Sequence, residues 1–105
     1  MTKSKVNGKS ELLEIAEALK VMGHPIRLNI MLKLAEQCCC VRDIWEYLQI
    51  PQAVVSQHLK ILEDHRVLEA RREGTKVCYL ITDSRIREIV RTLEKNVVMP
   101  ETVSA

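Results

Sequence analysis

The chain has 105 residues and a net charge of +2, and 47% of its residues are apolar and 29% charged. This composition excludes a disordered chain, and the length suits one small domain with a modest core. No apolar run approaches the ~18 residues of a membrane span and no secretion signal follows the N-terminal lysines, so we expect a cytoplasmic protein without a membrane partner.

The first predicted elements are two helices. Residues 1–9 are polar and are expected to form a flexible tail. Ser10 is placed to cap a helix that begins at Glu11, because apolar residues recur at helical spacing from there on. A proline in the first turn suits a second helix over residues 25–37. These two helices are expected to contribute one apolar face each to the core.

The next predicted elements are two short helices and a hairpin. After a cysteine-rich stretch, apolar spacing predicts a helix at 42–48 and, beyond a proline-containing turn, a fourth helix at 52–64. Residues 67–72 and 76–82 are rich in apolar and β-branched side chains around a Glu-Gly-Thr turn. This pattern predicts two strands joined as a β-hairpin.

A last amphipathic helix completes the predicted domain. Thr82 or Asp83 can cap it, and residues 99–105 are expected to be a flexible C-terminal tail. Four helices, a hairpin and a final helix, with two short helices joined by a tight turn before the hairpin, are typical of a winged helix-turn-helix. The sequence therefore predicts a mostly α fold with a small β-hairpin wing over residues 10–98.

The helix predicted at 52–64 has an apolar face and a polar face when residues are placed ~100° apart. The polar face carries amide, hydroxyl and lysine side chains and one alanine, which suit base edges and phosphates in a major groove. An ordinary solvated surface is the simpler interpretation of such a stripe alone, but the cationic tip of the hairpin adds groups suited to phosphates. The residues predicted to contact DNA are Gln52, Ala53, Ser56, Gln57, Lys60, Arg71, Arg72 and Lys76.

Three segments resemble the ArsR family of bacterial repressors. The helix-turn-helix that reads DNA in that family is similar to residues 48–62, LQIPQAVVSQHLKIL. The opening of the family's second helix is similar to the segment from Gly23, GHPIRLNIMLKL. The family's wing is similar to the segment from Val67, VLEARREGTKVCYLI. The resemblance covers residues 10–95. It implies a homodimer that uses its first and last helices as the interface, binds a dyad-symmetric double-stranded DNA operator, and releases it when an inducer is sensed.

The three histidines are expected to have structural roles. His58 lies on the apolar side of its helix, which indicates a buried ring bonded to a backbone carbonyl more than a ligand. His24 belongs to the motif that opens the second helix, where capping or packing is expected. His65 follows the end of a helix and is expected to be exposed.

Residues Cys38–Cys40 form a run in a chain with one other cysteine, Cys78. In a cytoplasmic protein, thiols are more often reactive or metal-binding than structural. Metal-sensing relatives carry Cys-Val-Cys-Asp-Leu at the start of the third helix, and the alignment that this implies puts Cys40 on the first cysteine and Arg42 on the second. Because a guanidinium cannot ligate a metal ion, half of that pair is missing. Residues 83–99, where the family has a second metal site, contain no histidine or cysteine.

Oxidation of the run demands less of the backbone than metal binding does. Extended residues two apart have Cα atoms ~6.6–7 Å apart, near the disulfide range of ~4.4–6.8 Å, so Cys38 can pair with Cys40; adjacent cysteines would form strained, easily reduced bonds. A helix start and Arg42 both favour a thiolate. Cys78 is expected to be a packed residue, with a resolving thiol as the alternative.

We therefore predict a repressor, not an enzyme, that releases its operator when Cys38, Cys39 and Cys40 are oxidised by peroxide or reactive sulfur, with no cofactor. The alternative is a repressor that responds to arsenite, zinc or cadmium through the same three cysteines. A repressor whose cysteines sense nothing is a third interpretation. Two rival classes remain: an enzyme with Cys40 as nucleophile, for which no second catalytic motif is visible, and a protein-interaction module.

Overall fold

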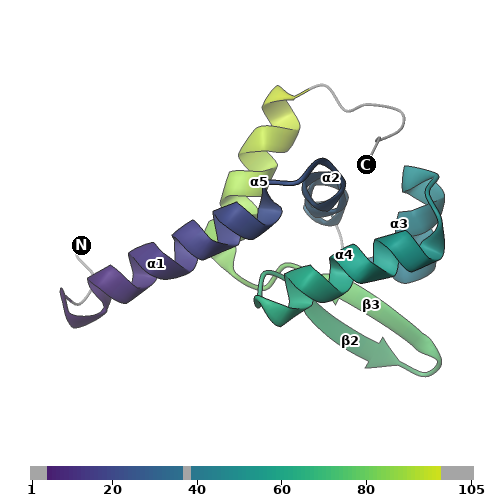
Figure 1. The fold of residues 1–105 in the computed structure, drawn as a ribbon, viewed down its shortest axis with the longest axis horizontal. Helices are drawn as coiled ribbons and strands as arrows, with labels where there is room; N and C mark the ends of the chain where they lie inside the picture. Colours follow the sequence, from purple (N-terminus) through teal and green to yellow (C-terminus); the bar gives the residue numbers. More distant parts are fainter. Residues whose placement is uncertain (1–4, 37–38, 98–105) are drawn as a thin grey trace.

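The computed structural model describes residues 5–36 and 39–97. Cys38 and the tail expected at 99–105 lie outside these residues. Figure 1 shows α2 near the centre, with α3 to its right, α5 to its left, α4 below it, and the hairpin below α4. The elements in chain order are α1 (Lys5–Met22), α2 (Pro25–Leu34), β1 (Cys39–Cys40), α3 (Val41–Leu48), α4 (Gln52–Asp64), β2 (Glu69–Glu73), β3 (Lys76–Leu80) and α5 (Ser84–Asn96).

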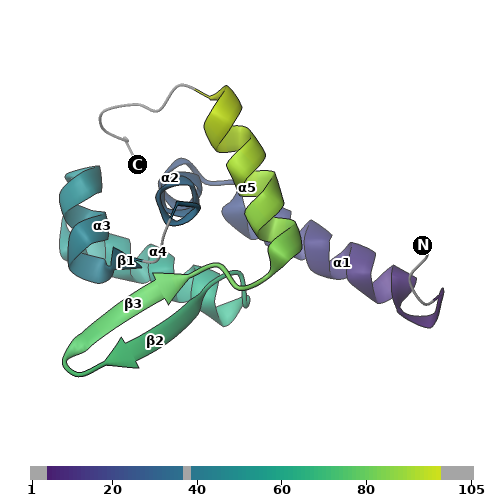
Figure 2. The same cartoon turned by 180° about the vertical axis from the view of Figure 1, so that it is seen from behind.

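The first helix is longer than predicted. α1 begins at Lys5, not at Glu11, so it includes residues 5–9 that were expected in a tail, and Ser10 lies inside the helix instead of capping it. Each residue added to an existing helix gains a backbone hydrogen bond, so a helix can extend past a possible cap. The N-terminal half of α1 projects away from the other elements (Figures 1 and 2).

The apolar face of α1 is only partly covered. Its last turn enters the core through Val21 and Met22, which are nearly fully buried. Leu12, Leu13 and Leu19 are instead 68%, 61% and 45% exposed. A monomer therefore leaves a leucine-rich surface open to water, which is unusual for side chains that favour burial.

The second helix begins as predicted. His24 is its N-cap: the imidazole accepts a hydrogen bond from the backbone N–H of Ile26 (3.1 Å), and Pro25 occupies the first turn. This confirms the capping role expected for His24. α2 ends at Leu34, earlier than predicted.

The helix-turn-helix joins α3 to α4 through a tight turn. Gln49 closes α3 in the left-handed conformation (φ 59°), and Pro51 is the N-cap of α4. The two helices pack together and contribute fully buried side chains to one core, among them Ile44, Leu48 and Val55. The predicted bounds of α4 are confirmed.

The sheet has three strands, one more than the sequence predicted. β1, β3 and β2 lie in that order and all pair antiparallel. β1 has only two residues, too few to show the alternation that marks a strand in sequence. β2 begins two residues later and ends one residue later than predicted, whereas β3 begins at Lys76 as predicted and ends two residues earlier. Gly74 supplies the positive φ of 65° in the turn between these strands.

The last helix begins at a side-chain cap. Of the two candidates, Asp83 and not Thr82 is the N-cap, and its carboxylate accepts a hydrogen bond from the backbone N–H of Arg85 (2.8 Å). Ile86 and Val90 anchor α5 in the core beside α2. Within the described ranges, no helix has both the length and the apolar character needed to cross a bilayer.

Candidate nucleic-acid interface and thiol cluster

The two faces of α4 have different environments. Its apolar face is in the core, where Val55, Leu59 and Leu62 are at most 1% exposed. Lys60 forms an ion pair with Asp64 (Nζ to Oδ1 3.3 Å), and exposed pairs of this kind contribute little to stability, so the ammonium can exchange this partner for a phosphate. The side chains predicted to read DNA from this helix are all exposed: Gln52, Ala53, Ser56, Gln57 and Lys60.

The cationic side chains predicted for the wing are exposed on the hairpin. Arg71 and Arg72 are successive residues of β2 and therefore lie on opposite faces of the sheet, and Lys76 begins β3 beside the turn. On the face that carries Arg72, burial raises the pKa of Tyr79 and Glu63 raises it further, while Arg72 and Lys60 lower it. Tyr79 thus lies within electrostatic reach of both cations, one from the wing and one from α4.

The two described cysteines of the run lie on opposite faces of β1. Cys39 is 4% exposed and belongs to the core, and Tyr79 is its register partner on β3. Cys40 is half-buried, and its register partner is Cys78. Successive strand residues point to opposite sides, so the thiols of Cys39 and Cys40 diverge. The pairing of Cys38 with Cys40 stays a prediction.

Cys40 lies where β1 passes into α3. It is the N-cap residue of that helix, and its thiol donates a hydrogen bond to Oδ2 of Asp43 (3.2 Å). The guanidinium of Arg42 is bonded to Glu46 one turn further along (Nε to Oε2 3.1 Å), and its side chain is 75% exposed. The sequence suggested that Arg42 supports a thiolate, but in the structure its described partner is a carboxylate of its own helix.

The position of Cys78 in the sheet is a feature that the sequence did not predict. Cys78 is half-buried in the middle of β3, between Cys40 on β1 and Arg71 on β2. No sequence signal could show this, because strand register between distant segments is a tertiary property. Within residues 5–36 and 39–97, no group of three or more His, Cys, Asp or Glu side chains is placed to hold a metal ion.

The histidine expected to bond a backbone carbonyl has a different partner. His58 is half-buried, its ring lies 4.6 Å from the ring of His24, and its Nδ1 is 3.5 Å from Nη1 of Arg27. Burial, then the charge of His24 and then that of Arg27 lower the pKa of His58. The expectation failed because His58 packs at the edge of the core, where α4 meets the start of α2. His65 is exposed, as predicted.

Comparison with known proteins identifies the family. Residues 24–70 match the family described as bacterial regulatory protein, arsR family. The chain is 41% identical over 81 residues to an HTH-type transcriptional regulator of Methanocaldococcus jannaschii, an alignment that covers 76% of this chain and 91% of the relative. The chain belongs to the ArsR family. The resemblance inferred from its three sequence motifs is therefore confirmed.

Two further relatives support the ArsR assignment. The transcriptional repressor SmtB of Mycobacterium tuberculosis is 40% identical over 81 residues, which cover 76% of this chain and 60% of the length of that relative. The crystal structure of the transcriptional repressor PagR of Bacillus anthracis is 35% identical and superimposes with a TM-score of 0.76, covering 81% of this chain and 98% of PagR. These ArsR-type relatives are regulators, not enzymes, which agrees with the prediction that the chain is not an enzyme.

Proposed function

We propose that this ArsR-family protein is a DNA-binding transcriptional repressor that releases a dyad-symmetric operator when thiols of the Cys38–Cys40 segment are oxidised. One observation carries the DNA-binding half: α4 buries its apolar face and exposes every side chain predicted to read DNA. The exposed cations of the hairpin supply phosphate contacts beside it.

This function requires a homodimer, because a dyad operator has two half-sites about 34 Å apart and each half-site needs one copy of the chain. The leucine-rich surface of α1 supports an interface through the first and last helices. Leu13 is 61% exposed and, with Ile15 of α1 and Ile86 of α5, it lines a groove of about 660 Å³ that α1, α5 and residues 65–67 after α4 form together. A second copy that fills this groove would remove Leu13 from water.

The position of Cys40 supports the redox half. It joins β1 to α3, and α3 packs against α4, so a change at its sulfur can reach the DNA-reading helix through direct contacts. The metal alternative needs the thiols of Cys39 and Cys40 to converge, whereas they now lie on opposite faces of a strand. Oxidation to a disulfide needs only one of these two thiols and a second thiol within reach of it.

The test is an operator titration with the full chain. A dyad operator is selected from a random library with reduced protein, and binding is followed by fluorescence anisotropy in parallel with peroxide, polysulfide, arsenite, zinc and cadmium. We expect tight, salt-dependent binding that peroxide or polysulfide weakens and dithiothreitol restores. Release by arsenite under reducing conditions would transfer the proposal to the metal alternative. Absence of salt-dependent DNA binding would overturn the repressor itself.

A further inference from the structure

We propose that Cys78 is the thiol that pairs with Cys40, and that their disulfide joins β1 to β3 at the base of the wing. This inference deepens the proposed function and rests on its redox half, since it names the second sulfur. The evidence is the strand register: Cys40 lies directly opposite Cys78 in the antiparallel pairing of β1 with β3.

The register brings these two residues within disulfide range. Directly opposed residues of antiparallel strands have Cα atoms ~4.5–5.5 Å apart and side chains on the same face. A disulfide spans Cα separations of ~4.4–6.8 Å. Both side chains are half-buried, so a small oxidant can reach them. Cys39 cannot compete for Cys78, because it lies on the opposite face, in the core.

The reaction needs a hydroperoxide as oxidant. The Cys40 thiol loses its proton to water and attacks the peroxide: an S–O bond forms, the O–O bond breaks, and the leaving hydroxide takes up a proton. The thiol of Cys78 then attacks the sulfenic sulfur, so that the S–S bond forms and the S–O bond breaks with loss of water. The two thiols lose two protons and two electrons in total, and hydrogen peroxide is reduced to two molecules of water.

The bond changes the geometry of the DNA-binding surface. Opposed Cβ atoms are ~4.5–5.5 Å apart in a strand pair but ~3.8 Å apart in a disulfide, so β1 must approach β3 by about 1 Å. β1 leads directly into α3, which packs against α4, while β3 pairs with the strand that carries Arg71. The Cys40 proton is also lost, and with it the hydrogen bond to Asp43.

The disulfide therefore displaces the helix-turn-helix relative to the wing. Because both must contact one operator at once, a fixed displacement lowers operator affinity. We expect the oxidised chain to stay folded and to bind the operator more weakly, because α4 alone and the hairpin alone can still contact DNA.

The pairing is tested by peptide mapping of the full chain after peroxide. Remaining thiols are alkylated in acid and the protein is cut with trypsin, which puts Cys38, Cys39 and Cys40 on peptide 34–42 and Cys78 on peptide 77–85. We expect these two peptides joined with loss of two hydrogens, in a chain that stays monomeric on a non-reducing denaturing gel. The link should also form in the Cys38→Ser, Cys39→Ala double variant. An internal disulfide confined to peptide 34–42 would overturn the inference.

Operator binding separates this inference from the proposed function. We expect peroxide to lower the operator affinity of the wild type by about tenfold or more. The operator affinity of Cys40→Ser or Cys78→Ser should change by less than about twofold, and Cys38→Ser should respond like the wild type. Cys78→Ala repeats the test in case the serine disturbs the strand. Cys78→Ser and Cys78→Ala must both bind the operator normally when reduced. If Cys78→Ser and Cys78→Ala still release, the inference is wrong and the redox function stands. If the wild type fails to respond to peroxide, the proposed redox function itself is wrong.

Discussion

Arg71 lies directly opposite Cys78 in the hairpin, on the side of β3 away from β1. The exposed guanidinium and the half-buried thiol therefore share one face of the sheet, and Cys40 completes the row on β1. A wing cation proposed to hold a DNA phosphate is thus the strand neighbour of a proposed sensing thiol. The two halves of the proposed function meet in this row of three residues.

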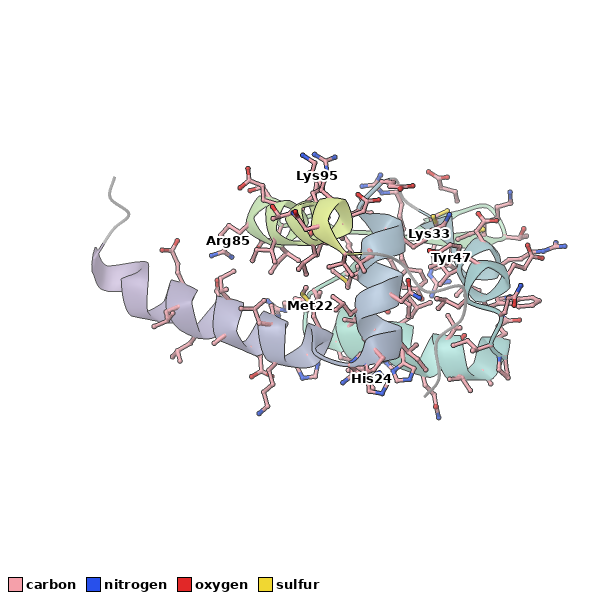
Figure 3. The ribbon with its side chains drawn as sticks, turned by 90° about the horizontal axis from the view of Figure 1, so that it is seen from above. Met22, His24, Lys33, Tyr47, Arg85 and Lys95 are labelled. Carbon is pink, nitrogen blue, oxygen red and sulfur yellow. The ribbon has the colours of Figure 1, made fainter. Side chains whose placement is uncertain are left out.

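Replacement of Arg71 tests the phosphate contact. We expect Arg71→Ala to weaken binding to operator and to random DNA alike, and to reduce the slope of log affinity against log salt by about 1, because a phosphate contact carries no sequence information. Anisotropy titrations over a salt series measure both quantities. Lys95→Ala, at the end of α5 across the molecule from the wing, is the matched control and should change neither (Figures 1 and 3). An unchanged salt slope for Arg71→Ala would remove this residue from the interface.

Replacement of Gln57 tests base reading by α4. The amide is exposed in the second turn of the helix and can form two hydrogen bonds to the major-groove edge of one adenine. We expect Gln57→Ala to cost about 1–3 kcal/mol on the selected operator, with little loss on random DNA and no change in salt slope. Equal losses on operator and random DNA would show that Gln57 contacts the backbone and not a base.

The sequence could predict elements that carry their own local pattern. α4 was predicted at its observed bounds because apolar spacing runs through the whole helix and a proline begins it. The cap by His24 was also readable, since it depends on adjacent residues. β1 was not readable, because two residues have no period and exist as a strand only through β3. The same limit hid the position of Cys78 opposite Cys40, because β1 lies far before β3 in the chain.

Replacement of Leu13 tests the dimer interface. A charge at position 13, in the groove that α1 and α5 help to form, would have to be desolvated if a second copy fills that groove, and desolvating a charge is costly. We expect Leu13→Glu to be monomeric at micromolar concentration by light scattering, and to bind operator weakly because its half-sites are no longer linked. Tyr47→Glu, an exposed apolar residue on α3, is the control and should leave the oligomeric state unchanged (Figure 3). A dimeric Leu13→Glu protein would place the interface elsewhere.

His58 predicts a pH dependence of stability. Its pKa in the folded chain lies below the ordinary value of 6.5, so the unfolded chain binds the proton more tightly. Stability should therefore be unaffected well above pH 6.5 and fall as the pH drops through 6.5 toward the lowered pKa. Urea unfolding followed by circular dichroism should show this loss in the wild type and a smaller loss in His58→Gln. A parallel pH dependence in both proteins would contradict the assignment.

Asp83 predicts a second, more acidic transition. Its pKa is lowered from 3.8 to about 2, chiefly by the hydrogen bond from the Arg85 side chain, with the backbone N–H of Arg85 also contributing. The ionised carboxylate stabilises the fold above pH 3.8, and this contribution is lost as the pH falls from 3.8 toward 2.

Two variants separate the charge of Asp83 from its capping role. Asp83→Ala removes both and should lower the free energy of unfolding at pH 7 by about 1 kcal/mol, the usual cost of losing an N-cap. Asp83→Asn keeps an oxygen that can accept from the N–H of Arg85, so it should lose less at pH 7. Since other carboxylates also titrate in acid, the difference in unfolding free energy between wild type and Asp83→Asn is the quantity to measure by urea unfolding. That difference should shrink between pH 4 and pH 2, and a constant difference would show that the Arg85 partnership does not depend on the ionised carboxylate.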